Sequence, residues 1–542
     1  MQFKLKGNLV DAYSKRIFPA EVIIVNGKID SISESKGKYS HYILPGLVDS
    51  HVHIESSMLS PSGFAYLAVK HGTVAVVSDP HEIANVAGIE GVCYMTDSAE
   101  TVPLKFYFGA PSCVPATEFE TSGARLDPED VKNLLNKDNI FFLSEVMNYP
   151  GVIYNEENIM QKIDLARKLN KPIDGHAPGL TGDGLLTYAN AGITTDHECL
   201  NINEAEEKIS AGIKIQIREG SAAKGFDNLF ELIDKYPESV MLCSDDMHPD
   251  DLIAGHINIL LSRGVKKGVN IFNLIKAASI NPVLHYNLSA GLLREGDNAD
   301  FIIVKDLKNF DVLETYIDGN KVFEKGNVLF NPVKKDFIKS FRTLHLNSEE
   351  IQIFAETDKI KIIKVKDGEL YTGSDIIKAT VKDRFVVADA SRDICKIVVV
   401  NKYGNYKPSV GFVSGFGLRN GAMAGSVAHD SHNIVAVGVE DKYIVEAVNS
   451  VIDMQGGLVA VSDFGKKFLQ LEIAGLMTNN EGEEVARSYK LLDKYVKKMG
   501  SGLSAPFMSL SFMALLVIPE LKIGDKGLFD VNEFSFTPLF IK

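Results

Sequence analysis

The chain has 542 residues, of which 45% are hydrophobic and 24% are charged. This balance is typical of globular proteins and excludes a disordered chain, a collagen and a coiled coil. The net charge is −14 and no long basic run is present, so nucleic acids and membranes are poor candidates as partners.

Strands are predicted in two separate stretches of the first part of the chain. The first covers residues 1–45 and contains a hairpin signal at Asn26-Gly27, and the second runs from Gly291 to about Phe330. Between them, short apolar runs rich in β-branched and aromatic residues alternate with segments of helical periodicity. This alternation predicts an α/β architecture, either a parallel βα barrel or a doubly wound sheet.

From about Asn347 the pattern changes to mixed α+β. Residues 395–400 favour a strand, and an apolar stripe at helical spacing runs from Val485 to Met499. Acidic residues precede this stripe, lysines end it and Gly500 follows it, as expected of one capped helix. We interpret the stripe as core packing.

The cysteine content indicates a reducing compartment. Five cysteines are widely spaced and form no C-x-x-C pair, so neither a disulfide framework nor a thiolate zinc site is expected. The first residues lack the apolar core of a signal peptide, and the apolar run Phe512–Ile518 is far shorter than the ~20 residues that span a bilayer. We therefore expect a cytoplasmic protein.

Imidazole and carboxylate side chains follow the predicted strands of the central part. His51 and His53 are two residues apart on one strand, so they point to the same face. Later apolar runs are each followed by one further candidate ligand, in the order Glu145, His176, His197 and Asp245. The carboxyl ends of the strands of a βα barrel gather at one face, so the pattern predicts a metal site there.

The residue types at this site indicate its chemistry. Histidine and carboxylate ligands without thiolate suit Zn, Mn or Fe(II). Four imidazoles and a bridging carboxylate can hold two ions ~3.5–4 Å apart, which make hydroxide available near neutral pH. An aspartate within reach can take a proton and pass it to a leaving group. The predicted reaction is metal-assisted hydrolysis at an electrophilic carbon.

The order of these groups is similar to that of the amidohydrolase superfamily. The segments PGLVDSHVHIESSMLSP, SDPHEIANVAG, LSEVMNYPGV, GHAPGL, AGITTDHE and CSDDMHPDDL resemble the adenine deaminase family, and HDSHNI resembles its C-terminal region. The resemblance covers nearly the whole chain. It implies a (β/α)8 TIM-like metal-dependent hydrolase barrel over residues 46–287, and a small composite β-sandwich domain formed by residues 1–45 and 288–346. A C-terminal α+β domain would follow over residues 347–542.

The resemblance also implies a function. It implies that adenine and water give hypoxanthine and ammonia in purine salvage, through attack of a metal-bound hydroxide on C6. The expected cofactor is a binuclear divalent centre, with Mn²⁺ or Fe²⁺ as the usual metal and Zn²⁺ as a further option. By position, the metal site would comprise His51, His53, Glu145, His176, His197 and Asp245. Asp245 would also act as general base, Glu145 would stand where many superfamily members carry a carboxylated lysine, and we expect a homo-oligomer.

Three further residues are expected to contact the substrate: His81, Glu82 and Ser112. Glu82 is the first candidate for protonating N1 of the purine, and its alternative role is to support a ligand or to begin a helix. Ser112 either contacts the base or belongs to a rigid turn set by two prolines. His429 and His432 lie outside the predicted barrel, and they either close over the site or serve the surface or core.

Two other functions remain open from the sequence. Substrate choice resides in loops, so the same ligands suit a hydrolase of another cyclic amide or amine, such as a dihydroorotase-like enzyme. A catalytically inactive barrel that serves as a binding module is the second alternative, and the complete set of ligand groups argues against it.

Overall fold

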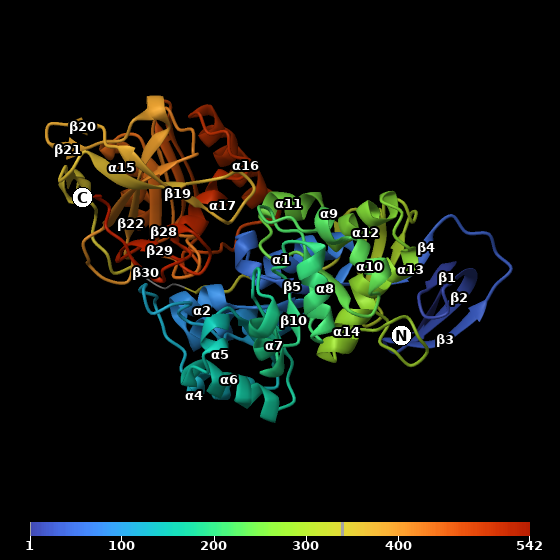
Figure 1. Cartoon of the computed structure of the whole chain (residues 1–542). Helices are drawn as coiled ribbons and strands as arrows, with labels where there is room; N and C mark the ends of the chain where they lie inside the picture. The colour runs from blue at the N-terminus through green and yellow to red at the C-terminus, as the bar shows by residue number, and fades with distance from the viewer. Residues whose placement is uncertain (1, 338–340, 542) are drawn as a thin grey trace.

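The computed structural model describes residues 2–337 and 341–541. Its central unit is a barrel of parallel strands, with one eight-stranded sheet on one side and a second eight-stranded sheet on the other (Figure 1). The barrel strands are β5 (Leu47–Val52), β6 (Thr73–Ser78), β7 (Lys105–Ala110), β8 (Ile140–Val146), β9 (Ile173–Gly175), β10 (Thr195–Asp196), β11 (Lys214–Arg218) and β12 (Val240–Cys243).

The barrel closes between its first and last strands. Strands β5 to β9 form one parallel run and β10 to β12 another. The Thr194 amide donates to the Ile173 carbonyl over 2.8 Å and connects the two runs. A parallel bridge between Val52 and Asp245 joins the end of β12 to β5. The closed barrel selects one of the two architectures that the alternating pattern allowed.

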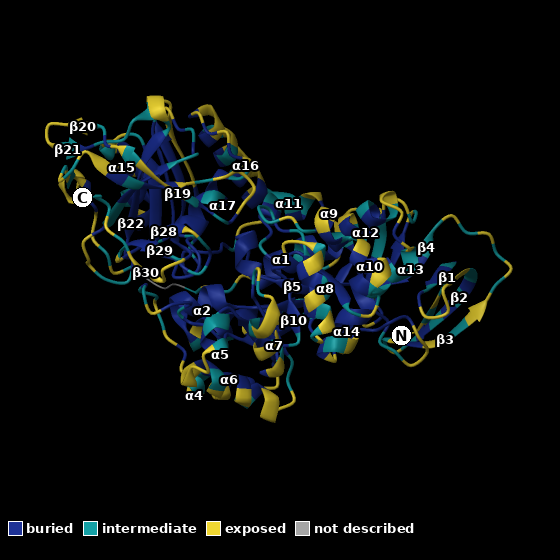
Figure 2. Ribbon diagram, in the orientation of Figure 1, coloured by how far each residue is buried: buried dark blue, intermediate teal, exposed yellow. Residues whose placement is uncertain are grey.

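Helices alternate with these strands and present buried faces to the barrel and exposed faces to solvent (Figure 2). Strands β5 and β6 are buried along their whole length, which explains their continuous apolar runs. Local signals begin several helices; Asp127, for example, forms a capping box with Asp130 at the start of α4. The main helices are α1 (Pro61–Ala68), α2 (His81–Ala87), α3 (Ile89–Ala99), α4 (Pro128–Leu135), α6 (Glu157–Lys168), α7 (Gly182–Asn190), α8 (Ile202–Ser210), α11 (Pro249–Ala254), α12 (Ile257–Lys266) and α14 (Asn281–Tyr286).

The segments before and after the barrel share one eight-stranded sheet. Its order is β16-β15-β14-β13-β4-β1-β2-β3, so β4, which leads into the barrel, pairs with β13, which follows it. The turn at Asn26-Gly27 joins β2 to β3, as the hairpin signal predicts. The strands are β1 (Gln2–Asp11), β2 (Arg16–Val25), β3 (Lys28–Glu34), β4 (Tyr42–Pro45), β13 (Phe301–Val304), β14 (Val312–Ile317), β15 (Asn320–Glu324) and β16 (Asn327–Val328).

The C-terminal unit is built on a second eight-stranded sheet of order β19-β18-β23-β22-β25-β24-β26-β27. Helix α15 (Asp441–Asp453) packs its apolar residues on this sheet. The strands are β18 (Lys359–Lys364), β19 (Gly373–Lys378), β22 (Ile394–Val400), β23 (Ser409–Ser414), β24 (Ala422–Gly425), β25 (Ile434–Gly438), β26 (Gly457–Ser462) and β27 (Gly465–Gln470).

The C-terminal unit and the barrel share one hydrophobic core. Helix α16 (Gly482–Lys498) buries Val485, Tyr489, Leu492 and Val496 in the same cluster as the barrel interior. The Tyr489 ring meets the His248 imidazole edge-on at 4.7 Å. The predicted apolar stripe therefore packs between the two units. Within the described part of the chain, no helix is both long enough and apolar enough to cross a bilayer.

Candidate metal centre and active site

The two histidines of the first barrel strand lie together inside the barrel mouth. His51 lies near the end of β5 and His53 directly follows the strand, and their Nε2 atoms are 3.2 Å apart. Both side chains are buried. His53 Nδ1 lies 3.2 Å from the Asp79 carbonyl oxygen, which can only accept, so Nδ1 carries the proton and Nε2 presents a lone pair to the cluster.

Glu145 lies between His53, which follows β5, and the two histidines that follow β9 and β10. Its Oε1 is 3.5 Å from His53 Nε2, whereas its Oε2 is 2.9 Å from His176 Nδ1 and 3.1 Å from His197 Nε2. Burial raises the pKa of Glu145, but His176 and His197 hold it well below its ordinary value. One ionised carboxylate thus faces two groups of imidazoles, one with each oxygen.

Asp245 completes the set opposite Glu145. Its Oδ1 is 3.3 Å from His53 Nε2 and 3.7 Å from His51 Nε2. A φ of 55° at Asp245, just past the end of β12, breaks the strand alternation there. The neighbouring Asp246 accepts a hydrogen bond from Ser56 Oγ over 2.5 Å.

The donor set fits divalent cations. Buried ligand atoms lie within 4.8 Å of one another in overlapping groups: His51, His53 and Asp245; His51, Glu145 and His197; and His53, Asp79, His81 and Glu145. His51 Nδ1, His176 Nε2 and His197 Nδ1 have no hydrogen-bond partner among the described residues. Imidazole and carboxylate groups so close together, all out of water, need a positive charge to offset their repulsion. The structure brings all six predicted ligands into this cluster.

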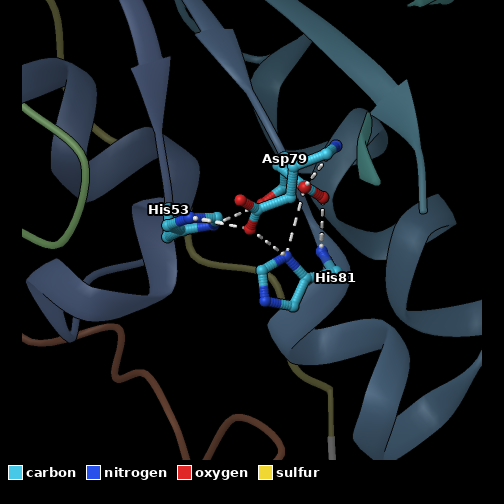
Figure 3. Close-up of side chains that lie close together, drawn as sticks. His53, Asp79 and His81 are labelled. Atoms are coloured by element: carbon cyan, nitrogen blue, oxygen red, sulfur yellow. Dashed lines mark hydrogen bonds and ion pairs between the residues drawn. The ribbon is translucent and has the colours of Figure 1, made fainter. Parts of the chain in front are cut away.

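Asp79, in the loop after β6, and His81, at the start of α2, adjoin the cluster, and Figure 3 shows their side chains converging with His53. His81 Nδ1 is 3.1 Å from Asp79 Oδ2 and 3.4 Å from Glu145 Oε1. Asp79 also accepts hydrogen bonds from the amides of His81 and Glu145, at 3.0 and 3.3 Å. Asp79 thereby ties the start of α2 to the end of β8.

Glu82, next to His81, meets two histidines of the C-terminal unit. His429 Nδ1 contacts Glu82 Oε1, and His432 Nε2 contacts Glu82 Oε2. Burial raises the pKa of Glu82, but these two imidazoles hold it well below its ordinary value. The sequence left two roles open for His429 and His432. The structure places both at the mouth of the barrel, beside the site, and not at the surface.

Ser112 takes a supporting position. Its hydroxyl donates to the Glu145 carbonyl oxygen over 2.5 Å, and the Lys162 ammonium donates to the Ser112 carbonyl over 2.8 Å. These contacts fix the backbone at the end of β8, which carries Glu145.

Sequence reasoning missed Glu198 and Arg218. Arg218 Nη2 donates to Glu198 Oε2 over 2.7 Å, and Nη1 donates to Asp245 Oδ2 over 2.7 Å. Glu198 Oε1 in turn lies 3.7 Å from both His176 Nδ1 and His197 Nε2. Both residues stand at strand ends, Glu198 directly after His197 and Arg218 as the last residue of β11, so the rule that found the ligands could have found them too.

A cavity of about 380 Å³ opens beside Glu198 and Arg218. Residues of the C-terminal unit supply one wall, from Gly368 to Tyr371 together with Ile518. The barrel residues that line it are Pro178, Glu198, Cys199, Leu200, Arg218, Ala223, Lys224, Gly225 and Asn228. The cavity thus lies between the two units, next to the cluster.

Comparison with known proteins agrees with the barrel fold. The amidohydrolase family model matches residues 42–322, and the adenine deaminase C-terminal domain model matches residues 369–535. Fold and site together therefore define an amidohydrolase. Adenine deaminase of Methanosarcina acetivorans is 52% identical over 99% of both chains, and that of Salinibacter ruber is 49% identical over 99% of both. The chain belongs to the adenine deaminase family.

Among solved structures, an amidohydrolase from an environmental sample of the Sargasso Sea is similar over 61% of this chain and 94% of its own. Its sequence identity is 13% and its TM-score is 0.48.

Proposed function

We propose that this chain hydrolyses adenine to hypoxanthine and ammonia. Its full-length similarity to curated adenine deaminases supports the substrate. The observation that carries the reaction class is the position of Glu145, which faces His53 with one oxygen and His176 and His197 with the other. A shared carboxylate between two groups of imidazoles is what a binuclear hydrolytic centre requires.

Six residues would hold the cofactor: His51, His53, Glu145, His176, His197 and Asp245. Divalent ions bound there lower the pKa of water, so that hydroxide is available near neutral pH. Imidazole and carboxylate donors without thiolate suit Mn²⁺, Fe²⁺ and Zn²⁺, and the similarity to the adenine deaminase family favours Mn²⁺ or Fe²⁺ among them. The free state of all five cysteines supports a reducing, cytoplasmic setting. A homo-oligomer and domain boundaries near residues 45, 287 and 346 stay predictions.

The two protons of the attacking water account for both products. One goes to the departing amine, which leaves as ammonia, and one goes to N1 of the purine. We assign the first transfer to Asp245, whose Oδ1 faces the imidazoles while Arg218 occupies Oδ2. We assign the second transfer to Glu82. Because Glu82 is ionised at the start, it would first take up this proton of the water and then donate it to N1.

His81 and Ser112 would contribute to substrate binding in different ways. His81 stays our proposed contact to the purine, because it lies between Glu82 and Glu145. The Ser112 hydroxyl already donates to the Glu145 carbonyl, so its contribution to substrate binding would be indirect.

An ammonia-release assay tests this function. The purified chain, loaded in turn with Mn²⁺, Fe²⁺ or Zn²⁺, is offered adenine, guanine, cytosine and dihydroorotate. We expect ammonia from adenine alone, and more of it with Mn²⁺ or Fe²⁺. Opening of the cyclic amide with adenine inert would favour the dihydroorotase-like alternative. Inactivity on every substrate, with no metal bound by elemental analysis, would favour the binding module.

A further inference from the structure

Two histidines from the C-terminal unit hold both oxygens of a barrel carboxylate. His429 and His432 lie in the loop between β24 and β25, and each contacts one oxygen of Glu82 in α2. All three side chains are at most 3% exposed. The adjacent His81 has its Nδ1 3.4 Å from Glu145 Oε1. The contact between Glu82 and the two histidines is therefore one residue away from the cluster of proposed metal ligands.

The protonation of His432 can be read from its neighbours. Its Nδ1 accepts a hydrogen bond from the Ala428 amide over 3.3 Å, so that nitrogen carries the lone pair. In a neutral imidazole the other nitrogen, Nε2, then carries the proton and donates to Glu82. Burial lowers the pKa of His432, which agrees with a neutral ring. A nitrogen that donates has no lone pair for a metal, so a hydrogen bond fits this contact better than a further cation does.

His429 is held by the C-terminal unit and charged by its surroundings. Its ring stacks on Phe512 with centroids 4.5 Å apart and planes 16° apart. Burial lowers the pKa of His429, but Glu82, Asp246 and Asp430 more than offset this and raise it to about 9. Glu82 therefore accepts one hydrogen bond from a cationic imidazole, His429, and one from a neutral imidazole, His432.

The loop that carries both histidines is anchored near its C-terminal end. Asn433 Nδ2 donates to the carbonyl of Thr121 in the barrel over 2.9 Å, and Tyr403 Oη donates to the Ser431 carbonyl over 2.6 Å. Fixing a glutamate side chain in one orientation costs rotamer entropy. Hydrogen bonds from two donors on an anchored loop hold Glu82 in one orientation before the substrate binds.

We propose that His429 and His432 are positioning residues for Glu82, so that the C-terminal unit completes the active site of the barrel. The proposal rests on the proposed function, in which Glu82 delivers a proton to N1. It assigns a catalytic purpose to a unit that carries none of the six proposed metal ligands.

A double-mutant cycle on the full-length, Mn²⁺-loaded enzyme tests this. We expect His432→Leu to lower kcat/KM for adenine by about 10²-fold, at the lower end of what a lost general acid costs. In a Glu82→Gln background the same change should cost less than about twofold, because the group it positions is already gone. A general structural role would give equal losses in both backgrounds and would overturn the proposal.

Amide replacements give a second measurement, should the leucine variant fail to fold. The amide nitrogen of glutamine lies near the position of imidazole Nε2, and that of asparagine near Nδ1. We therefore expect His432→Gln to retain more activity than His432→Asn, and His429→Asn more than His429→Gln. The reverse order, or equal losses, would contradict the assigned contacts.

Metal content and a remote histidine provide the controls. His345 is exposed and pairs with Asp453 on the surface, so His345→Gln should leave kcat/KM and the thermal midpoint unchanged. The His429 and His432 variants should keep the metal content of the wild type, and loss of an ion would show that these histidines are ligands instead. An inactive wild type would refute the proposed function, whereas an active wild type with additive losses would refute only this inference.

Discussion

Arg218 donates a hydrogen bond from Nη1 to Oδ2 of Asp245 over 2.7 Å, which leaves Oδ1 of Asp245 facing the imidazoles of His51 and His53. Burial raises the pKa of Asp245, but the charge of Arg218 holds it well below its ordinary value. The arginine thus fixes which oxygen faces the cluster and keeps the carboxylate ionised, as a proton acceptor must be.

Replacing Arg218 tests this arrangement. Arg218→Met should lower kcat by about 10²-fold, because Asp245 loses its orientation and Glu198 loses its partner. The thermal midpoint should fall as well, since two buried carboxylates are left without their cation. Arg263, which pairs with Glu219 and Asp227 on the outside of the barrel, supplies the control, and Arg263→Met should keep kcat within about twofold of the wild type. Equal kcat in the two variants would contradict the role of Arg218.

Asp245→Asn separates proton transfer from metal binding. The amide keeps an oxygen near His53 but cannot take a proton at neutral pH, so kcat should fall by at least about 10³-fold. Metal content, measured by elemental analysis after gel filtration, should stay close to that of the wild type because five other ligands remain. A near-normal kcat would refute the assignment of Asp245 as the base.

Glu145→Gln tests whether this residue bridges two ions. Glutamine offers one oxygen instead of two and carries no charge, so it cannot face both groups of imidazoles as the carboxylate does. We expect metal content to fall to one ion per chain or none. Two ions that survive dialysis against a chelator would contradict bridging.

The sequence was sufficient to predict that the six proposed ligands lie together, because their positions follow from a simple geometric rule. Each proposed ligand, from His51 to Asp245, lies at or just after the end of a predicted strand, and parallel strands bring their carboxyl ends together. The same rule covers Glu198 and Arg218, but a single sequence does not show which strand-end charges point inward. Periodicity alone could not choose between a barrel and an open sheet, since that choice depends on the pairing of β12 with β5.

Contacts between distant segments were beyond sequence reasoning. The pairing of Glu82 with His429 and His432 spans more than three hundred residues, and neither histidine lies in a pattern that marks a site. Motif spacing works within one supersecondary unit, whereas docking of one unit on another depends on the shape of the whole surface. The sequence therefore left open whether His429 and His432 close over the site, and the structure places both at the active-site mouth.

Removing residues 347–542 should abolish activity and leave the remainder insoluble. The C-terminal unit shares the largest hydrophobic cluster with the barrel, so its loss would expose apolar side chains that now pack against α16. It would also remove both histidines that hold Glu82. Expression followed by gel filtration and the ammonia assay checks this. A soluble, fully active truncation would refute both the shared core and the positioning role.

A buried lysine of the C-terminal unit should make stability depend on pH. Lys402 is 1% exposed and donates to the Ala474 carbonyl over 3.3 Å, and no carboxylate of the described residues forms an ion pair with it. Burial lowers its pKa to about 7. Between this value and the ordinary lysine pKa of about 10.4, the unfolded chain binds more protons than the folded chain, so stability rises with pH across that window.

Lys402→Met removes this dependence. The free energy of unfolding that the variant gains over the wild type should be larger at pH 6 than at pH 9 by about 3 kcal/mol, because at pH 6 the wild type must bury a charged ammonium. Urea unfolding of both proteins at the two pH values measures the difference. Lys494 is exposed on α16, so Lys494→Met should show no such difference and serves as the control. An equal gain for Lys402→Met at both pH values would show that Lys402 keeps an ordinary pKa despite its burial.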